Sequence, residues 1–144
     1  MILPDEAATH GAGAALAAML RPGDVVLLEG PLGAGKTTLV RGLLAALGHE
    51  GEVPSPSFAI VQPYEDLDTP VWHVDLFRLE SPGELEELGL DSLSESTLLV
   101  EWPERAGENA WPEALRLALE FGQNGYRILT ADVPPSWQHR WPPE

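Results

Sequence analysis

The sequence contains no cysteine, a single lysine and few basic residues of any kind. Without cysteine the chain can form neither a disulfide nor a thiolate metal site, which favours a reducing, cytoplasmic setting. Lys and Arg together number 8 against 23 acidic residues, so the formal charge is −15 and binding to nucleic acid or an anionic membrane by this chain alone is disfavoured. No apolar run approaches the roughly 20 residues of a membrane span, and no basic secretion signal opens the chain. We therefore expect an acidic subunit that docks on another protein.

The remaining composition indicates one packed domain. Hydrophobic residues make up 44% of the 144 positions and include five tryptophans, which is enough for a core. No internal repeat and no linker divides the chain. We predict a single domain over residues 1–133, followed by an irregular tail, rich in proline and tryptophan, over residues 134–144.

The stretch GPLGAGKT, residues 30–37, matches the phosphate-binding pattern G-x-x-x-x-G-K-[ST]. It follows the apolar run 25–28 and precedes the helical pattern 38–44, so it has the strand–loop–helix context that the pattern requires. Its glycines accept dihedrals that let backbone N–H groups turn toward a phosphate, and the following helix adds its positive dipole end. The sequence therefore predicts a nucleotide-binding loop.

Two side chains of this loop are predicted to contact the nucleotide and its metal. Lys36 would reach the outer phosphates, and Thr37 would offer its hydroxyl to Mg²⁺. Lys36 is the only lysine, since the other seven of the eight basic residues are arginines. A chain that uses arginine everywhere else keeps lysine where a compact charge must lie among phosphates.

Two acidic residues are candidates for the metal and for catalysis. Glu101 follows the continuous apolar run 97–100, which is typical of a buried parallel strand. Asp75 lies in a predicted strand over residues 71–79, where it shares one face with His73. Glu101 is the stronger candidate for holding Mg²⁺, because a central strand opens into the ligand crevice at its carboxyl end. The alternative for both is an acid that faces solvent.

Other side chains allow two interpretations each. Ser57 belongs to a Ser-Pro-Ser segment that either senses the outer phosphate or only forms a turn. His73 is either a general base or structural, and Trp102 is either part of the core or a lid over the nucleotide. Arg41 and Arg78 are candidates for neutralising phosphate charge; for Arg41, which lies on the helix after the loop, the alternative is that it only pairs with acids.

The order of elements predicts an α/β fold, a P-loop NTPase-like three-layer sandwich with a mostly parallel central sheet and antiparallel hairpins at its edge. The alternating pattern 115–121, the turn signal Asn124-Gly125 and the segment 126–131 predict one such hairpin. The guanine motif N-K-x-D is absent, which disfavours a GTPase, and no arginine-rich kinase lid is visible. A small-molecule or nucleoside kinase and a nucleotide-sensing binding module are the alternative functions.

Several segments together resemble the TsaE (YjeE) family, the P-loop ATPase subunit of the bacterial machinery that makes threonylcarbamoyladenosine in tRNA. The resemblance extends from Leu3 to about Arg105, and the final hairpin matches only in kind. The segments stand in the order LPDEAAT, GPLGAGKTTLVRGLLAALG, VPSPSF, HVDLFRLESPGELEELGL and LLVEWPER.

The resemblance implies roles for individual residues. Thr37 and Glu101 bind Mg²⁺, Asp75 is needed for ATP turnover, Trp102 lies near the nucleotide, and Thr9 lines the adenine side. Arg127 is the nearest match to a hairpin arginine that helps there in relatives. The expected catalytic residues are Lys36, Asp75 and Glu101. The expected metal ligands are Thr37, Glu101 and Asp75. The expected nucleotide-binding residues are Thr9, Gly30, Leu32, Gly33, Ala34, Gly35, Lys36, Thr37, Thr38, Ser57, Trp102 and Arg127.

The chain departs from the family pattern at two positions. Ser57 replaces the usual Thr and keeps a hydroxyl, whereas Phe77 replaces the usual Tyr and loses one. The family's partners are the TsaB–TsaD pair, in which TsaD transfers the threonylcarbamoyl group. The resemblance therefore implies ATP and Mg²⁺ as cofactors. It also implies an ATPase that resets this complex between turnovers and does not bind tRNA itself.

Overall fold

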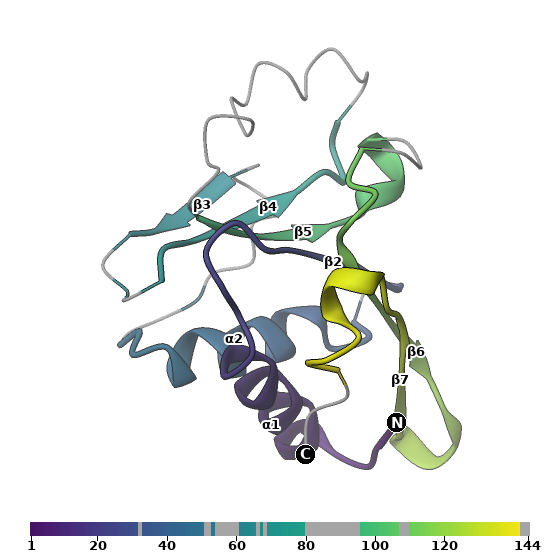
Figure 1. Ribbon diagram of the computed structural model, residues 1–144. Helices are drawn as coiled ribbons and strands as arrows, with labels where there is room; N and C mark the ends of the chain where they lie inside the picture. The colour runs from purple at the N-terminus through teal and green to yellow at the C-terminus, as the bar shows by residue number, and fades with distance from the viewer. Residues whose placement is uncertain are drawn as a thin grey trace.

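The structure, a computed structural model, describes residues 1–31, 33–50, 53, 61–65, 67, 69–79, 96–106 and 110–141. Seven strands and two α-helices make up this part of the chain (Figure 1). The elements in chain order are β1 (Ile2–Leu3), α1 (Glu6–Ala17), β2 (Val25–Glu29), α2 (Lys36–Ala46), β3 (Val61–Tyr64), β4 (Val71–Asp75), β5 (Thr97–Glu101), β6 (Leu115–Phe121) and β7 (Arg127–Asp132), with short 3₁₀ helices at Pro103–Ala106, Gln123–Gly125 and Pro135–Trp137.

All seven strands form one sheet in the order β1-β7-β6-β2-β5-β4-β3. The four central strands β6, β2, β5 and β4 are parallel, and the pairs at the two edges are antiparallel. This arrangement confirms the predicted α/β class, with a mostly parallel centre and antiparallel edges. Because β2, β4 and β5 run in one direction, the residues that follow them meet at one edge of the sheet.

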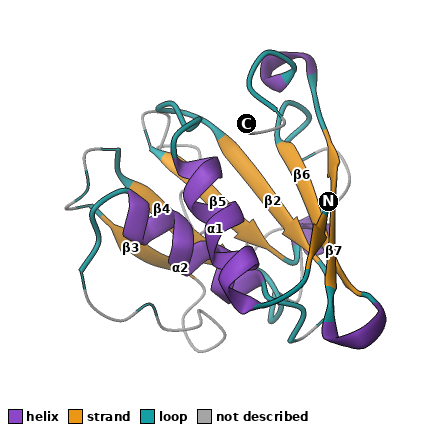
Figure 2. Ribbon diagram, turned by 90° about the horizontal axis from the view of Figure 1, so that it is seen from below, coloured by secondary structure: helices purple, strands orange, loops and turns teal. Residues whose placement is uncertain are grey.

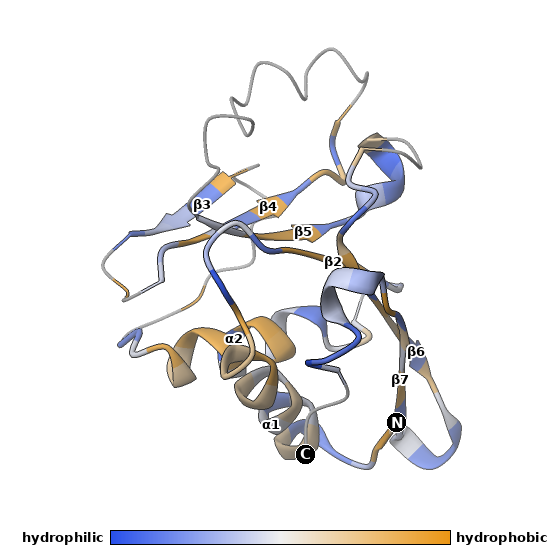
Figure 3. Ribbon diagram, viewed as in Figure 1, coloured by the Kyte–Doolittle hydropathy of each residue, from blue (hydrophilic) through white to orange (hydrophobic). Residues whose placement is uncertain are grey.

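The two α-helices lie side by side on one face of the sheet, as Figures 1 and 2 show from two directions. Two glycines allow this close approach. A Cβ on Gly13 of α1 would lie 1.9 Å from the carbonyl oxygen of Leu39, and one on Gly42 of α2 would lie 1.9 Å from that of His10. The helices and this face of the sheet enclose the larger part of the core, and Figure 3 shows the hydrophobic residues gathered on α2 and the central strands.

The opposite face of the sheet carries a second, smaller hydrophobic cluster that includes Leu27, Val74 and Val100. Among the described residues this cluster is covered by Trp72, Trp102, Trp111 and Ala106 of the first 3₁₀ helix. The described part of the third layer thus includes the 3₁₀ helix Pro103–Ala106 and Trp111. Residues 80–95 lie outside the described residues.

Residues Ile2–Leu3 pair with β7, and helix α1 begins at Glu6, where Asp5 caps it by accepting from the N–H of Ala8 at 2.8 Å. One local prediction needs correction. Strand β4 ends at Asp75 and does not continue to residue 79, because the Asp75 carboxylate accepts the N–H of Phe77 and turns the chain.

The C-terminal segment packs against the domain. Trp137 is 1% exposed and belongs to the main core. Arg140 stacks on the Trp137 ring at 3.8 Å and pairs with Asp24 at 2.7 Å, which holds the segment beside the start of β2. Within the described residues, no helix is long and apolar enough to cross a membrane.

Candidate functional site

Buried polar side chains are concentrated at one end of the sheet. The described residues include six buried polar or charged side chains, and Thr97 is the one that lies elsewhere. The other five are Thr9, Lys36, His73, Asp75 and Glu101, with exposed fractions between 0% and 7%. Burying polar groups is unfavourable unless they are paired or used, so this cluster marks a candidate site.

The glycine loop is shaped by positive backbone dihedrals. Gly30, Gly33 and Gly35 have φ values of 142°, 79° and 108°, and a Cβ on Gly30 would lie 2.3 Å from the carbonyl oxygen of Leu119. Helix α2 begins at Lys36, and no side chain caps its first N–H groups. These N–H groups and the positive end of the helix therefore remain available to an anion.

Lys36 extends from the start of α2 across the loop. Its ammonium donates a hydrogen bond of 2.7 Å to the carbonyl oxygen of Gly30 and lies 3.9 Å from the centroid of the Trp102 ring. Burial lowers the pKa of Lys36, and the nearby charges of Glu101, Asp75 and Glu104 oppose that shift. The site thus disfavours the charged ammonium relative to water, and lysines with lowered pKa values are concentrated at functional sites.

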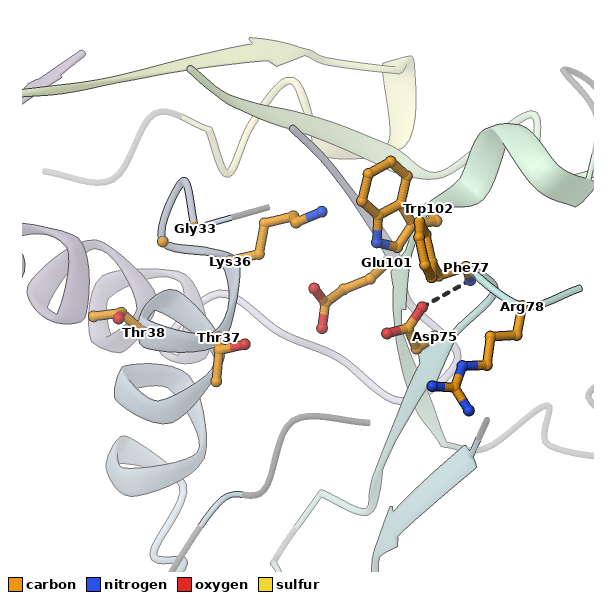
Figure 4. Close-up of a pocket in the computed structure, with 10 residues that line it drawn as sticks. Gly33, Lys36, Thr37, Thr38, Asp75, Phe77, Arg78, Glu101 and Trp102 are labelled. Carbon is orange, nitrogen blue, oxygen red and sulfur yellow. Dashed lines mark hydrogen bonds between the residues drawn. The ribbon is translucent and has the colours of Figure 1, made fainter. Parts of the chain in front are cut away.

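The two carboxylates come from neighbouring strands. Asp75 ends β4 and Glu101 ends β5, and the parallel register sets these two residues side by side. Burial raises the pKa of Asp75; the hydrogen bond from the Phe77 N–H opposes this shift and the Glu101 charge adds to it. The Glu101 carboxylate contacts His73, whose Nε2 lies 2.6 Å from Oε2. Figure 4 shows both carboxylates facing Lys36 and Thr37 across the site.

Trp102 follows Glu101 with a φ of 58°, a left-handed conformation that is uncommon for a residue with a side chain. Its ring packs against the Phe77 ring at a centroid distance of 5.0 Å. The indole therefore forms one wall of the site above the Lys36 ammonium (Figure 4). Strained dihedrals of this kind are concentrated at functional sites.

These side chains line a cavity of about 460 Å³. Its walls are Gly33, Gly35, Lys36, Thr37, Thr38, Asp75, Phe77, Arg78, Glu101 and Trp102. A second cavity of about 250 Å³ shares Gly33, Gly35 and Thr38 with the first and adds Asp5, Glu6, Thr9, Gly125 and Arg127. The two cavities therefore adjoin at the glycine loop.

The chain matches a known family along most of its length. The family model described as "Threonylcarbamoyl adenosine biosynthesis protein TsaE" matches residues 3–128. The chain belongs to the TsaE family.

Individual relatives agree with this assignment. The tRNA threonylcarbamoyladenosine biosynthesis protein TsaE of Streptomyces coelicolor is 47% identical over 112 residues, which cover 75% of this chain and 76% of the relative. The protein of the same name from Bacillus subtilis is 40% identical over 116 residues, 79% of this chain and 72% of the relative. The crystal structure of Bacillus subtilis YdiB superposes with a TM-score of 0.82 at 30% identity and covers 96% of this chain and 88% of that one.

Most of the predicted site residues of this TsaE family member lie around the two cavities. Gly30 reaches the site through its carbonyl oxygen, which Lys36 contacts, while Ala34 is buried in the core beneath the loop. Arg127 lies on the second cavity, where Nη2 is 3.4 Å from the Gly33 carbonyl oxygen. Leu32 and Ser57 lie outside the described residues.

Two arginines were candidates for neutralising phosphate charge. Arg78 lines the first cavity, whereas Arg41 is exposed on α2 and lines neither cavity. The structure thus brings one of them to the site.

Sequence reasoning missed three features of the site. It did not predict the His73–Glu101 contact, the Gly30 carbonyl as the partner of Lys36, or Phe121, on whose ring Arg127 stacks at 4.6 Å. The alternation of His73 with Asp75 signalled a shared face, but the strand neighbour that supplies Glu101 follows only from the sheet order.

Proposed function

We propose that this chain is a Mg²⁺-dependent ATPase that serves the TsaB–TsaD complex in forming threonylcarbamoyladenosine in tRNA. One observation carries the proposal: the buried ammonium of Lys36 and the buried carboxylates of Asp75 and Glu101 face one another across a cavity beside a glycine loop. A cation among free N–H groups suits a polyphosphate, and carboxylates opposite suit its metal.

The loop and Lys36 bind the phosphates in this proposal. The uncapped N–H groups at the start of α2 take the phosphate oxygens, and Gly33 and Gly35 let the backbone approach them closely. Lys36 leaves the Gly30 carbonyl and the indole of Trp102 to pair with the outer phosphates. The fold has already removed water from Lys36, and this burial lowers its pKa.

The donor set around the cavity fits Mg²⁺. Thr37 and Glu101 line it with hard oxygen ligands that would hold the ion, and Asp75 beside Glu101 is left for the attacking water. Mg²⁺ is typically bound by one or two carboxylates together with the phosphates of its nucleotide. The ion, when bound, neutralises the charge that develops on the phosphate oxygens.

The second cavity receives the nucleoside end of ATP. Thr9 forms its floor beside Gly35, and the Arg127 guanidinium flanks it from the β6–β7 hairpin. The cavity adjoins the phosphate loop through Gly33 and Gly35, so one molecule can occupy both parts. Arg127 is held in place by the ring of Phe121 and the carbonyl oxygen of Gly125.

Hydrolysis requires a water in line with the γ-phosphate. We assign Asp75 to orient this water and accept its proton, because burial raises the pKa of Asp75 and so makes it a better base than an exposed aspartate. The water oxygen bonds to the γ-phosphorus as the bond to ADP breaks. Lys36 and the loop N–H groups stabilise the charge on the transferring group.

The charge of the chain suits a subunit that acts on other proteins in the cytoplasm. The formal charge of −15 disfavours binding of tRNA by this chain. The TsaB–TsaD pair would therefore bind the tRNA substrate. ATP binding and hydrolysis would then reset that complex between turnovers. Weak hydrolysis by the isolated chain is the expected behaviour of such a subunit.

The test measures phosphate release from ATP and Mg²⁺ with and without a TsaB–TsaD pair. Release to water that increases when the partners are added supports the proposal. Transfer of the phosphate to a metabolite or nucleoside would show a kinase instead. Nucleotide binding without release in either condition would show a sensing module, and both of these results overturn the ATPase.

A further inference from the structure

The deepest polar contact of the site joins two residues of neighbouring strands. His73 of β4 is 0% exposed, and its Nε2 lies 2.6 Å from Oε2 of Glu101 on β5. A carboxylate only accepts hydrogen bonds, so the proton of this bond is on Nε2. Short bonds to a charged acceptor are stronger and more directional than neutral ones, so this contact fixes the orientation of the carboxylate.

We propose that His73 is a positioning residue that holds Glu101 in the orientation needed to bind the metal of the Mg–nucleotide complex. Among the described residues the contact occupies Oε2 and leaves Oε1 to the cavity that Glu101 lines. The proposal rests on the proposed function, because it concerns the same metal. It goes beyond that function by giving His73 a role that touches neither nucleotide nor ion.

The surroundings of His73 argue against a purely structural role. Its Nδ1 is buried and has no hydrogen-bond partner among the described residues. An apolar side chain of similar size would avoid this unfavourable burial, so packing alone does not explain a histidine here. Within the part of the chain that the structure describes, the one polar contact of the ring is the contact to Glu101, and it therefore accounts for the residue.

Partners that orient metal ligands have a known effect when they are removed. The loss of such a partner typically lowers metal affinity about 10- to 100-fold while the ligand itself remains. The same change has little effect on groups that bind the phosphates directly. The proposal therefore predicts a defect in Mg²⁺ dependence that is separate from nucleotide binding without metal.

The experiment compares His73→Gln with His73→Leu in the full chain. The Gln amide can return a donor near the Nε2 position, whereas Leu keeps the bulk and removes the donor. Calorimetric titration of ADP at increasing Mg²⁺ gives the Mg²⁺ concentration that half-maximally strengthens ADP binding. We expect this concentration to rise about 10- to 100-fold in His73→Leu and to stay within about threefold of the parent in His73→Gln. ADP affinity in EDTA should be unchanged in both variants.

Two further measurements complete the test. In a Glu101→Gln background, His73→Leu should add no further shift in Mg²⁺ dependence, because the residue acts through Glu101. If His73→Leu does not fold, His73→Asn gives the same contrast, since its shorter amide does not reach the Nε2 position.

The outcomes separate the two proposals. If the ADP affinity of the parent protein does not change with Mg²⁺, both the proposed function and this inference are overturned. If ADP binding depends on Mg²⁺ in the parent and depends on it equally in His73→Leu, the inference is overturned and the proposed function is not. An equal shift in His73→Gln and His73→Leu also overturns it, because loss of shape and not of the donor would then be the cause.

Discussion

The ammonium of Lys36 lies 3.9 Å from the centroid of the Trp102 ring while it donates to the Gly30 carbonyl at 2.7 Å. In this arrangement the only lysine of the chain is occupied by an aromatic face and a backbone oxygen. A polyphosphate must draw the ammonium away from both. The indole is therefore placed to report the arrival of the nucleotide.

Nucleotide binding should change the fluorescence of Trp102. Loss of the cation from the ring face alters the environment of the indole, so ADP with Mg²⁺ should shift the intensity or wavelength of emission. The control is Trp102→Phe, which retains the other four tryptophans and should bind ADP without this signal. An equal signal from Trp102→Phe would show that a different tryptophan responds.

Asp75→Asn should abolish turnover and retain nucleotide binding. The amide cannot accept a proton from water, and loss of a general base typically lowers the rate about 100-fold or more. It still offers an oxygen to the Phe77 N–H, so the turn after β4 should persist. The measurements are single-turnover phosphate release and ADP affinity; loss of both together would assign Asp75 to binding instead.

The same variant should also change the pH dependence of stability. Burial raises the pKa of Asp75 above its ordinary 3.8, so the folded state binds this proton more tightly than the unfolded chain. Protonation of Asp75 contributes fully to the stability of the folded state when the pH is below the ordinary pKa. This contribution is lost as the pH rises through the raised pKa of the folded state. At neutral pH Asp75→Asn should therefore raise the Tm, and the gain should shrink as the pH falls toward 3.8. A gain that does not vary with pH would contradict the raised pKa.

Two glycines of α1 should respond in opposite ways to alanine. Gly13→Ala forces a Cβ to within 1.9 Å of the Leu39 carbonyl oxygen on α2, so the variant should lose about 3 kcal/mol of unfolding free energy as the helices separate. Gly11→Ala meets nothing within 4 Å and should gain about 0.5–1 kcal/mol from helix propensity. Urea unfolding of both variants measures the difference, and equal effects would refute the close helix contact.

Arg127→Ala should weaken ADP binding about 10-fold, because it removes a cation from the wall of the second cavity. Arg21→Ala is the matched control, since it changes the net charge by the same amount. Arg21 is exposed and precedes the start of β2, whereas the glycine loop follows the end of that strand. Equal losses in both variants would indicate a general effect of charge and not a contact in the cavity.

Much of the fold was predictable because its signals are local. The glycine loop with Lys36 specified a strand, a turn and a helix, and the apolar run before Glu101 specified a buried parallel strand. The alternation from Leu115 to Phe121 and the Asn124-Gly125 turn specified the hairpin. In each case the residues that decide the structure are neighbours in the sequence.

The missed features depend on residues far apart in the chain. The pairing of Ile2–Leu3 with β7, the ion pair of Arg140 with Asp24 and the contact of His73 with Glu101 all follow from the sheet order and its register. Sequence periodicity shows which face a side chain takes, but it does not show which strand lies beside it. The partner of a buried polar group is therefore the part of the site that the sequence alone leaves open.

The central claim is that the cavity beside the glycine loop holds Mg–ATP through Lys36. Calorimetric titration of a non-hydrolysable ATP analogue with Mg²⁺ into the parent chain and Lys36→Ala tests it most directly. The parent should bind one molecule per chain, and the variant should bind about 100-fold more weakly, because a charge-assisted contact to phosphate is lost. Equal affinity in the two proteins would contradict the account.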